Sequence, residues 1–267
     1  MEIKLLNILD FFYFRKDIKN CLGTDLIGFL KDILVEQYIF HVEYSNGSTM
    51  LWKTDRVNDK FKITDIFDIA NKNKKKIFGQ KYSKKDFVYI SNEQDNIISK
   101  LGCTEKSSNK FMKMSSLDNI KFEEGFLDFT FEKLEKGKNE NIRCELQNDA
   151  FFSNKRTPLR TRDVRYEMGR KCYIPELSYF IKQNDEYVGY GQILLLDKKY
   201  TISNFCVKPN FQGHGVGKIL LKFLLFKAKI YGVKEIYIKV KSDNLTACKL
   251  YTNTGFETFE KTSFYEI

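Results

Sequence analysis

The chain has 267 residues, 42% of them hydrophobic, and a formal net charge of +10 at neutral pH. This length allows one large domain or two of ordinary size, and the hydrophobic content is high enough for a packed core, which excludes a disordered chain. No run of about 18 apolar residues occurs, so no membrane-spanning helix is expected.

The ends and the charge distribution predict a soluble, cytoplasmic protein. The apolar stretch 5–14 is interrupted by Asn7 and Asp10, and no small-residue cleavage site follows it, so no secretory signal is expected. Lysines are spread over the whole chain instead of forming one basic stripe. We therefore interpret the positive charge as compositional bias and do not expect a nucleic-acid partner.

Cysteine and histidine usage does not indicate a metal site. None of the six cysteines forms a C-x-x-C pair, and the chain has only two histidines. The scattered cysteines fit reduced thiols in a cytosol. Cys206 and Cys248 are interpreted as small core residues, because neither has a histidine nearby that would activate it as a nucleophile.

The N-terminal part, residues 1–118, is predicted to be a smaller α+β domain. Helical spacing of Leu26, Leu30 and Ile33 indicates an amphipathic helix, and Asn46-Gly47 is a hairpin signal. In chain order we expect a helix over 24–37, strands over 38–44 and 49–53, a helix over 63–78, a strand over 87–91, a helix over 92–101 and a strand over 110–114.

The C-terminal part, residues 119–267, is predicted to be α+β with a mostly antiparallel sheet and flanking helices. The main helix is expected over 215–230, with Ile219, Phe223, Phe226 and Ile230 at helical spacing. The other helices are expected over 143–152, 161–169 and 244–252, and the strands over 176–182, 187–196, 200–207, 235–240, 256–259 and 264–267. The charged stretch 116–141 is either a linker or contains a strand over 126–131.

The strongest motif is a glycine-rich turn between a predicted strand and the main helix, with the sequence Gln212-Gly213-His214-Gly215-Val216-Gly217. Glycines let the backbone turn tightly and approach a ligand closely. Backbone N–H groups at a helix N-terminus, together with the helix dipole, favour a pyrophosphate, and Lys218 adds positive charge. The spacing is neither that of a P-loop nor that of a Rossmann turn. An ordinary tight turn is the alternative.

The residues around this turn resemble the GNAT (GCN5-related N-acetyltransferase) superfamily. Gln212, Gly215 and Gly217 occupy the fixed positions of its Q/R-x-x-G-x-G/A signature. Downstream, residues 244–256 resemble its N-x-x-A-x-x-L-Y…G-F segment, and upstream 188–190 resemble its VGY strand. The resemblance covers about 80 residues, from 187 to 267, and implies a GNAT fold and acetyl-coenzyme A as cosubstrate.

The resemblance also implies residue roles. Backbone groups of the strand Phe205-Cys206-Val207 would bond the pantetheine arm, and the N–H groups of Gly213, His214, Gly215, Val216, Gly217 and Lys218 would hold the pyrophosphate. Asn244 would bond the cofactor arm, and Tyr251 would protonate the leaving thiolate. A helix N-cap is the alternative for Asn244, and a half-buried core aromatic is the alternative for Tyr251.

The general base is left open by the sequence. Many members of the family carry a glutamate on the strand that ends in the cofactor turn, whereas strand 200–207 has Ser203 and Asn204 but no carboxylate. Glu145, Asp149 and Glu176 are the candidates, and each also fits an ordinary surface or capping carboxylate.

Three functions are consistent with these residues. The first is an N-acetyltransferase that transfers an acetyl group to a primary amine of a small molecule or peptide by direct attack. The second is a catalytically weak module that senses acetyl-coenzyme A, and the third is a nucleic-acid-associated protein. Residues 87–114 weakly resemble the last third of a GNAT domain but no glycine turn precedes them, so the N-terminal part is interpreted as a degenerate GNAT-like domain or as an unrelated α+β domain.

Overall fold

A computed structural model of the chain describes residues 2–6, 16, 19–20, 22, 26–34, 36, 38–45, 48–57, 60–69, 81–82, 87–91, 104–122, 128–153 and 156–266. The chain divides into two compact units, Met1–Ser108 with Lys261–Ile267 (unit 1) and Asn109–Glu260 (unit 2). Each unit has its own core. The expected division after residue 118 remains a prediction about where separate domains begin and end.

Unit 1 is built on a sheet with the strand order β5-β1-β2-β3-β4-β6-β13. Its neighbouring strands are antiparallel except β4 and β6, which are parallel at Phe61↔Phe87. Helix α2 places Phe29 against Phe40, with ring centroids 4.8 Å apart. The bounds are β1 Glu2–Leu5, α2 Leu26–Leu34, β2 Ile39–Ser45, β3 Ser48–Val57, β4 Lys60–Ile69, β5 Lys81–Tyr82, β6 Phe87–Ser91 and β13 Glu257–Glu266.

Unit 2 has the strand order β7-β12-β11-β10-β9-β8 and one parallel pair, β11 with β12. Consecutive buried residues in the middle of β9 and β10 mark strands that are covered on both faces. The bounds are β7 Thr104–Met114, β8 Phe129–Lys133, α4 Glu140–Ala150, α5 Thr161–Met168, β9 Tyr173–Gln183, β10 Glu186–Leu196, β11 Lys199–Val207, η2 Pro209–Phe211, α6 Val216–Tyr231, β12 Ile236–Lys241 and α7 Leu245–Thr254.

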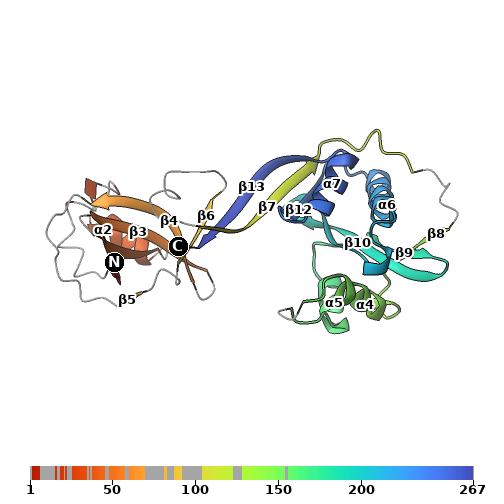
Figure 1. The fold of residues 1–267 in the computed structure, drawn as a ribbon, viewed down its shortest axis with the longest axis horizontal. Coiled ribbons are helices and arrows are strands. Elements are labelled where there is room, and N and C mark those ends of the chain that lie inside the picture. The colour runs from red at the N-terminus through yellow and green to blue at the C-terminus, as the bar shows by residue number, and fades with distance from the viewer. Residues whose placement is uncertain are drawn as a thin grey trace. The chain divides into compact units, whose positions relative to one another are not determined.

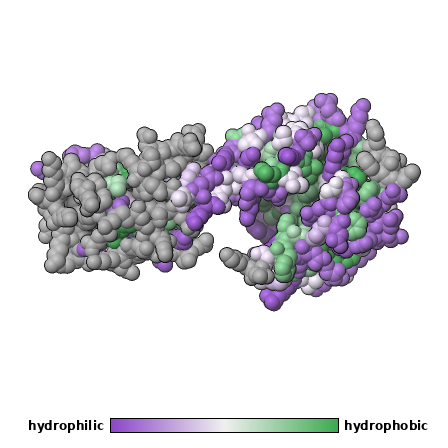
Figure 2. Space-filling model, viewed as in Figure 1, coloured by the Kyte–Doolittle hydropathy of each residue, from purple (hydrophilic) through white to green (hydrophobic). Residues whose placement is uncertain are grey.

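Helices cover both faces of the unit 2 sheet (Figure 1). The helices α6 and α7 pack on one face, where Leu220, Leu221 and Leu224 are completely buried. The helices α4 and α5 pack on the other, around Tyr190 and Phe180. Figure 2 shows apolar and neutral residues gathered on the viewed face of unit 2, bordered by hydrophilic ones.

The α+β fold expected for the C-terminal part is confirmed, with a mixed, mostly antiparallel sheet. Every helix and strand expected from residue 143 onward is present within a few residues, although the two last strands form the single strand β13, since no glycine or proline interrupts 257–266. The buried face of α6 also differs from the prediction: Ile230 is 63% exposed, and the core side chains are the leucines at 220, 221, 224 and 225.

One expectation for the N-terminal part is wrong. The helix expected over 63–78 begins as strand β4, with Ile63 fully buried and paired with Thr54. Sheet contacts on both sides of this strand outweigh a helical spacing that the isoleucines also satisfy. Residues 70–78, the helix expected over 92–101 and the Asn46-Gly47 turn lie outside the described residues, as do 126–127 at the start of one expected strand.

Within the described part of the chain, no helix is both long and apolar enough to cross a membrane.

Candidate functional site

The glycine turn has the backbone geometry of an anion-binding loop. Gly213 and Gly215 have φ angles of +79° and +85°, in the left-handed region that favours glycine. A Cβ atom added at either position would meet no protein atom within 4 Å, so both face open space. Gly215 is the N-cap of α6, where the first-turn N–H groups have no intrahelical partner. The turn can therefore accept a pyrophosphate.

The other residues of the turn either hold its backbone in place or lie at the surface. The amide of Gln212 donates to the carbonyl of Val207 at 2.9 Å, which ties the turn to the end of β11. Val216 is buried in the core, whereas His214 and Lys218 are exposed. Lys218 lies in the first turn of α6, so its positive charge adds to that of the helix N-terminus.

The parallel strands β11 and β12 separate next to this turn. They pair at Thr201↔Tyr237 and Ile202↔Ile238, and in this fully described region no further pair follows. From Ser203 to Val207, β11 pairs with no residue of β12, and the carbonyl of Val207 at the end of this segment accepts from the Gln212 side chain. An extended ligand arm can add to such an edge as a strand does.

A β-bulge lies where the two strands separate. On β10 one residue, Gly191, stands between the pairs Tyr190↔Cys206 and Gln192↔Ser203, whereas β11 has two, Asn204 and Phe205. Asn204 has a φ of 53°, a conformation that asparagine tolerates better than most residues. A Cβ added at Gly191 would lie 2.7 Å from Leu224 Cδ1 and 3.0 Å from Phe205 Cδ2, so a larger residue here would force these side chains to shift.

Tyr251 and Asn244 both belong to α7, beside the free edge. Tyr251 is buried, and its ring centroid lies 6.3 Å from that of Phe205. Burial raises the pKa of the Tyr251 phenol, so the hydroxyl keeps its proton at neutral pH. Asn244 is the N-cap of α7, and its side chain accepts from Ala247 N at 3.1 Å. The N-cap alternative for Asn244 is thus seen in the structure, and it leaves the side-chain amide group exposed.

Cys206 and Cys248 are core residues, as expected. Both are buried, and burial raises the pKa of the Cys206 thiol to about 12. A thiol with such a pKa is not ionised at neutral pH and is a poor nucleophile. Cys206 therefore does not fit the role of an acyl-carrying nucleophile.

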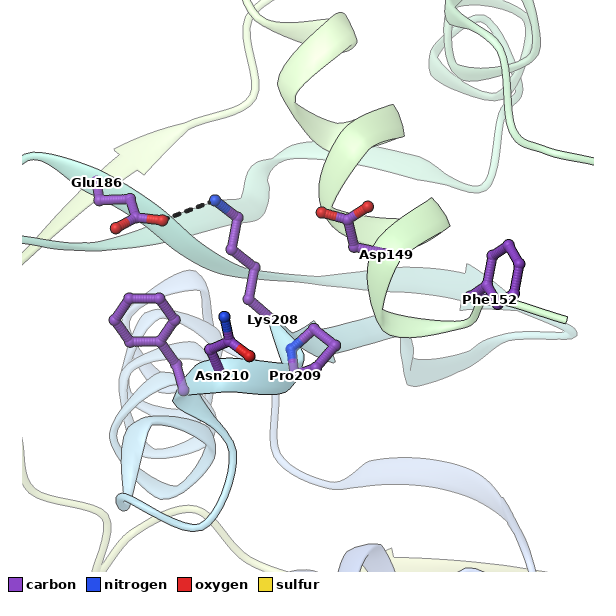
Figure 3. A pocket seen from close by; sticks show the side chains of 7 residues that line it. Asp149, Phe152, Glu186, Lys208, Pro209 and Asn210 are labelled. Carbon is purple, nitrogen blue, oxygen red and sulfur yellow. Dashed lines mark hydrogen bonds and ion pairs between the residues drawn. The ribbon is translucent and has the colours of Figure 1, made fainter.

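The three carboxylates considered as bases do not come together. Glu145 and Glu176 are exposed, whereas Asp149 lines a cavity of about 450 Å³ with Glu186 and Lys208 (Figure 3). Lys208 Nζ pairs with Glu186 Oε1 at 2.8 Å. Two carboxylates and one ammonium do not suit a phosphate, so this cavity does not compete with the glycine turn for a pyrophosphate. Elsewhere in the described residues, no group of histidine, cysteine and acidic side chains could hold a metal ion.

A buried charged cluster at the bulge was missed by the sequence prediction. Arg143 of α4 is 1% exposed, and its Nη1 lies 2.9 Å from Oε1 of Glu167 on α5. Glu167 also accepts from Gln192 Nε2 at 2.6 Å and from Asn204 Nδ2 at 3.2 Å. A weak signal existed: both charged residues lie on the core side of short helices, three residues from buried Leu146 and Val164.

Comparison with known proteins agrees with this geometry. Residues 143–256 match the family described as Acetyltransferase (GNAT) family. This part of the chain is a GNAT domain. The match begins at α4 and ends before β13, so it contains the glycine turn, the bulge and α7.

Two curated relatives align with parts of this domain. A [ribosomal protein bS18]-alanine N-acetyltransferase of Haemophilus influenzae is 32% identical over 80 residues, which are 30% of this chain and 54% of that enzyme. An uncharacterised protein of Mycobacterium leprae is 32% identical over 120 residues, which are 43% of this chain and 31% of that protein. The chain thus spans between a third and about half of these relatives.

The fold similarity extends beyond the GNAT domain. The crystal structure of a GCN5-related N-acetyltransferase from Sphaerobacter thermophilus has a TM-score of 0.59 and 13% sequence identity, and the match covers 98% of this chain and 94% of that one. A GNAT-family acetyltransferase from Colwellia psychrerythraea has a TM-score of 0.51 at 12% identity, with both chains fully covered. At these identities the similarity concerns the fold alone.

Proposed function

We propose that the chain is an acetyl-coenzyme A-dependent N-acetyltransferase that acetylates a primary amine by direct attack. The observation that carries this proposal is the combination of two features at one end of β11: a left-handed glycine turn that faces open space and a strand edge that β12 leaves free. The glycine turn suits a pyrophosphate, and the strand edge suits an amide-containing arm. Coenzyme A contains both groups.

The residue roles follow from this arrangement. N–H groups of Gly213, His214, Gly215, Val216, Gly217 and Lys218 would hold the pyrophosphate. The backbone of Phe205, Cys206 and Val207 would pair with the pantetheine arm, and the exposed amide of Asn244 would bond the same arm. Bound acetyl-coenzyme A would supply an activated acetyl group as a thioester.

Tyr251 would assist the departure of the thiolate. Its hydroxyl is protonated at neutral pH, lies beside Phe205, and has no hydrogen-bond partner among the described residues. It is therefore free to donate to a sulfur atom that gains negative charge as the thioester breaks.

A turnover screen tests the proposal. The full chain would be mixed with acetyl-coenzyme A and separate classes of amine, and the release of free thiol followed with a thiol reagent. Because the Haemophilus relative is named for an alanine of a ribosomal protein, peptides with N-terminal alanine are the first acceptors to test, followed by lysine peptides, polyamines and amino acids. We expect thiol release that depends on one acceptor class. Saturable binding of acetyl-coenzyme A without release for any amine would contradict the proposal and indicate a sensing module.

A further inference from the structure

The cluster of Arg143, Glu167, Gln192 and Asn204, here called the bulge clamp, joins four separate elements at one point. Arg143 and Gln192 are buried, and Glu167 and Asn204 are partly exposed. Arg143 comes from α4, Glu167 from α5, Gln192 from β10 and Asn204 from β11. The guanidinium contacts the carboxylate with two nitrogens, Nη1 at 2.9 Å and Nη2 at 3.1 Å. Nη2 makes a hydrogen bond and Nη1 an ion-pair contact, and together they limit the orientation of both partners.

The carboxylate of Glu167 is largely occupied by donors of the protein. Its Oε1 contacts Arg143 Nη1 and accepts from Gln192, and its Oε2 accepts from Arg143 Nη2 and from Asn204. A carboxylate offers about four acceptor positions, and here three accept hydrogen bonds, while Arg143 Nη1 lies against Oε1 as an ion-pair contact. Burial alone would raise the pKa of Glu167, but the hydrogen bonds and charge of Arg143 outweigh it and hold the pKa below its usual value. The group is thus a poor general base, although it lies at the site.

The two remaining contacts of Glu167 go to the two strands that form the bulge. Gln192 lies on β10 directly after Gly191, and Asn204 is the bulged residue of β11 with a left-handed backbone. The side chain of Gln192 is itself held by Tyr190, whose hydroxyl donates to it at 2.6 Å. Through these bonds the carboxylate fixes the backbone on both sides of the bulge.

A cluster of this kind is better suited to positioning than to stability. Bringing an arginine and a glutamate out of water costs as much as their attraction returns, so a buried pair contributes little net stability. Such a pair instead holds the side chains that it joins in one arrangement. Asn204 immediately precedes Phe205, the first residue of the segment assigned above to the pantetheine arm, so the clamp sets where that segment starts.

We propose that the bulge clamp is a positioning device that holds β11 so that the thioester lies in line with the incoming amine. This inference rests on the proposed function. The clamp holds the side chain of the bulged residue Asn204, next to the segment assigned to the pantetheine arm, whereas the pyrophosphate turn is held separately by Gln212 and α6. Disturbing the clamp should therefore slow the chemical step and leave cofactor affinity nearly unchanged, because misplacement by about 1 Å can cost about 10² in rate.

Asn204→Gly tests the proposal with the least disturbance of folding. Glycine accepts the φ of 53° and removes only the side-chain donor to Glu167. Asn184→Gly is the matched control, since Asn184 also has a positive φ, 47°, but lies exposed in the β9–β10 turn. Glu167→Gln is the second variant; it removes the charge that pairs with Arg143, and its melting temperature would be measured alongside.

The first readout is independent of turnover. Amide hydrogen exchange of residues 203–207 would be measured in the full-length wild type, Asn204→Gly and Asn184→Gly. Loss of a hydrogen bond to a charged group should speed exchange by roughly ten- to a hundred-fold in Asn204→Gly only. Unchanged exchange in that variant would overturn the proposal, whether or not an acceptor amine is known.

The second readout separates positioning from general damage. In Asn204→Gly, kcat should fall at least about ten-fold while the Kd for coenzyme A changes less than about three-fold, which is the signature of an interaction that matters in the transition state. Equal losses of kcat and affinity, or an unchanged kcat despite faster exchange, would overturn the proposal that the clamp positions the thioester for catalysis. If exchange responds as expected but the wild type acetylates no amine, the proposed function fails and the clamp still holds the bulge.

Discussion

At the scale of single residues, the site depends on glycines that no other residue replaces freely. Gly215 has a left-handed backbone and faces open space. We expect Gly215→Asn to raise the Kd for coenzyme A by about ten-fold or more, a loss of about 1.4 kcal/mol, because a side chain there fills the space that a pyrophosphate needs. Asparagine tolerates the backbone conformation, so the protein should still fold. Calorimetric titration measures the effect.

The same helix supplies the control for this substitution. Gly232, which caps the other end of α6, has a φ of +92° and also faces open space. Gly232→Asn carries the same backbone cost without approaching the turn. Coenzyme A affinity equal in the two variants would refute the assignment of the pyrophosphate to the glycine turn.

A substitution of Tyr251 tests its proposed role in the chemical step. Tyr251→Phe keeps the ring that packs against Phe256, with centroids 5.8 Å apart, and removes the hydroxyl alone. If that hydroxyl donates to the leaving sulfur, kcat should fall by about 10² or more with coenzyme A affinity nearly intact. An unchanged kcat, measured with an acceptor found in the turnover screen, would assign the proton to water or another group.

The backbone geometry of the glycine turn could be predicted from the sequence, whereas the bulge clamp, which depends on long-range contacts, could not. The glycine turn was located because alternating glycines between a strand and an apolar helix are rarely needed for packing alone. Arg143 and Glu167 are 24 residues apart, on helices whose contact depends on tertiary packing, so spacing could not pair them. The sequence indicated this pair only through the core-facing positions of both residues on their helices.

At the scale of elements, the sheet of unit 2 depends on β7, which precedes the family match. Residues 109–114 pair with β12, and Met112, Met114 and Leu117 are buried in the same core as α6. A fragment 109–260 should therefore fold and bind coenzyme A. A fragment 122–260 loses those three side chains, at about 2–5 kcal/mol for each large-to-small loss in a core, against a typical total stability of about 5–15 kcal/mol.

We thus expect the shorter fragment to show no cooperative melting and no coenzyme A binding. Circular dichroism on heating and calorimetry compare the two fragments directly. Equal melting temperatures would show that β7 is dispensable for unit 2.

Helices and strands were predicted from the sequence most reliably where the hydrophobic pattern and the turn-forming residues indicate the same boundaries. From residue 143 onward, turns and glycines separate the elements, and each expected helix or strand is found. In unit 1 the isoleucines of β4 fit both a helical and an alternating spacing, and only the neighbouring strands β3 and β6 decide between them.

At the scale of the whole molecule, the two units share one strand plan. In each, an antiparallel meander (β2-β3-β4 or β9-β10-β11) leads to a parallel pair, β4 with β6 or β11 with β12. We propose that unit 1 is a degenerate GNAT-like copy, because residues 1–118 contain no glycine turn of the Q-x-x-G-x-G kind. It would then contribute structure, and no second cofactor site.

The number of coenzyme A sites per chain tests the central claim most directly. Isothermal titration of the full-length chain with acetyl-coenzyme A should give one site, which Gly215→Asn weakens and Gly232→Asn leaves unchanged. Two equivalent sites would contradict the assignment of unit 1 as a copy that does not bind. No binding to a folded chain would contradict the cofactor site at Gly213 and Gly215, and with it the proposed acetyl transfer.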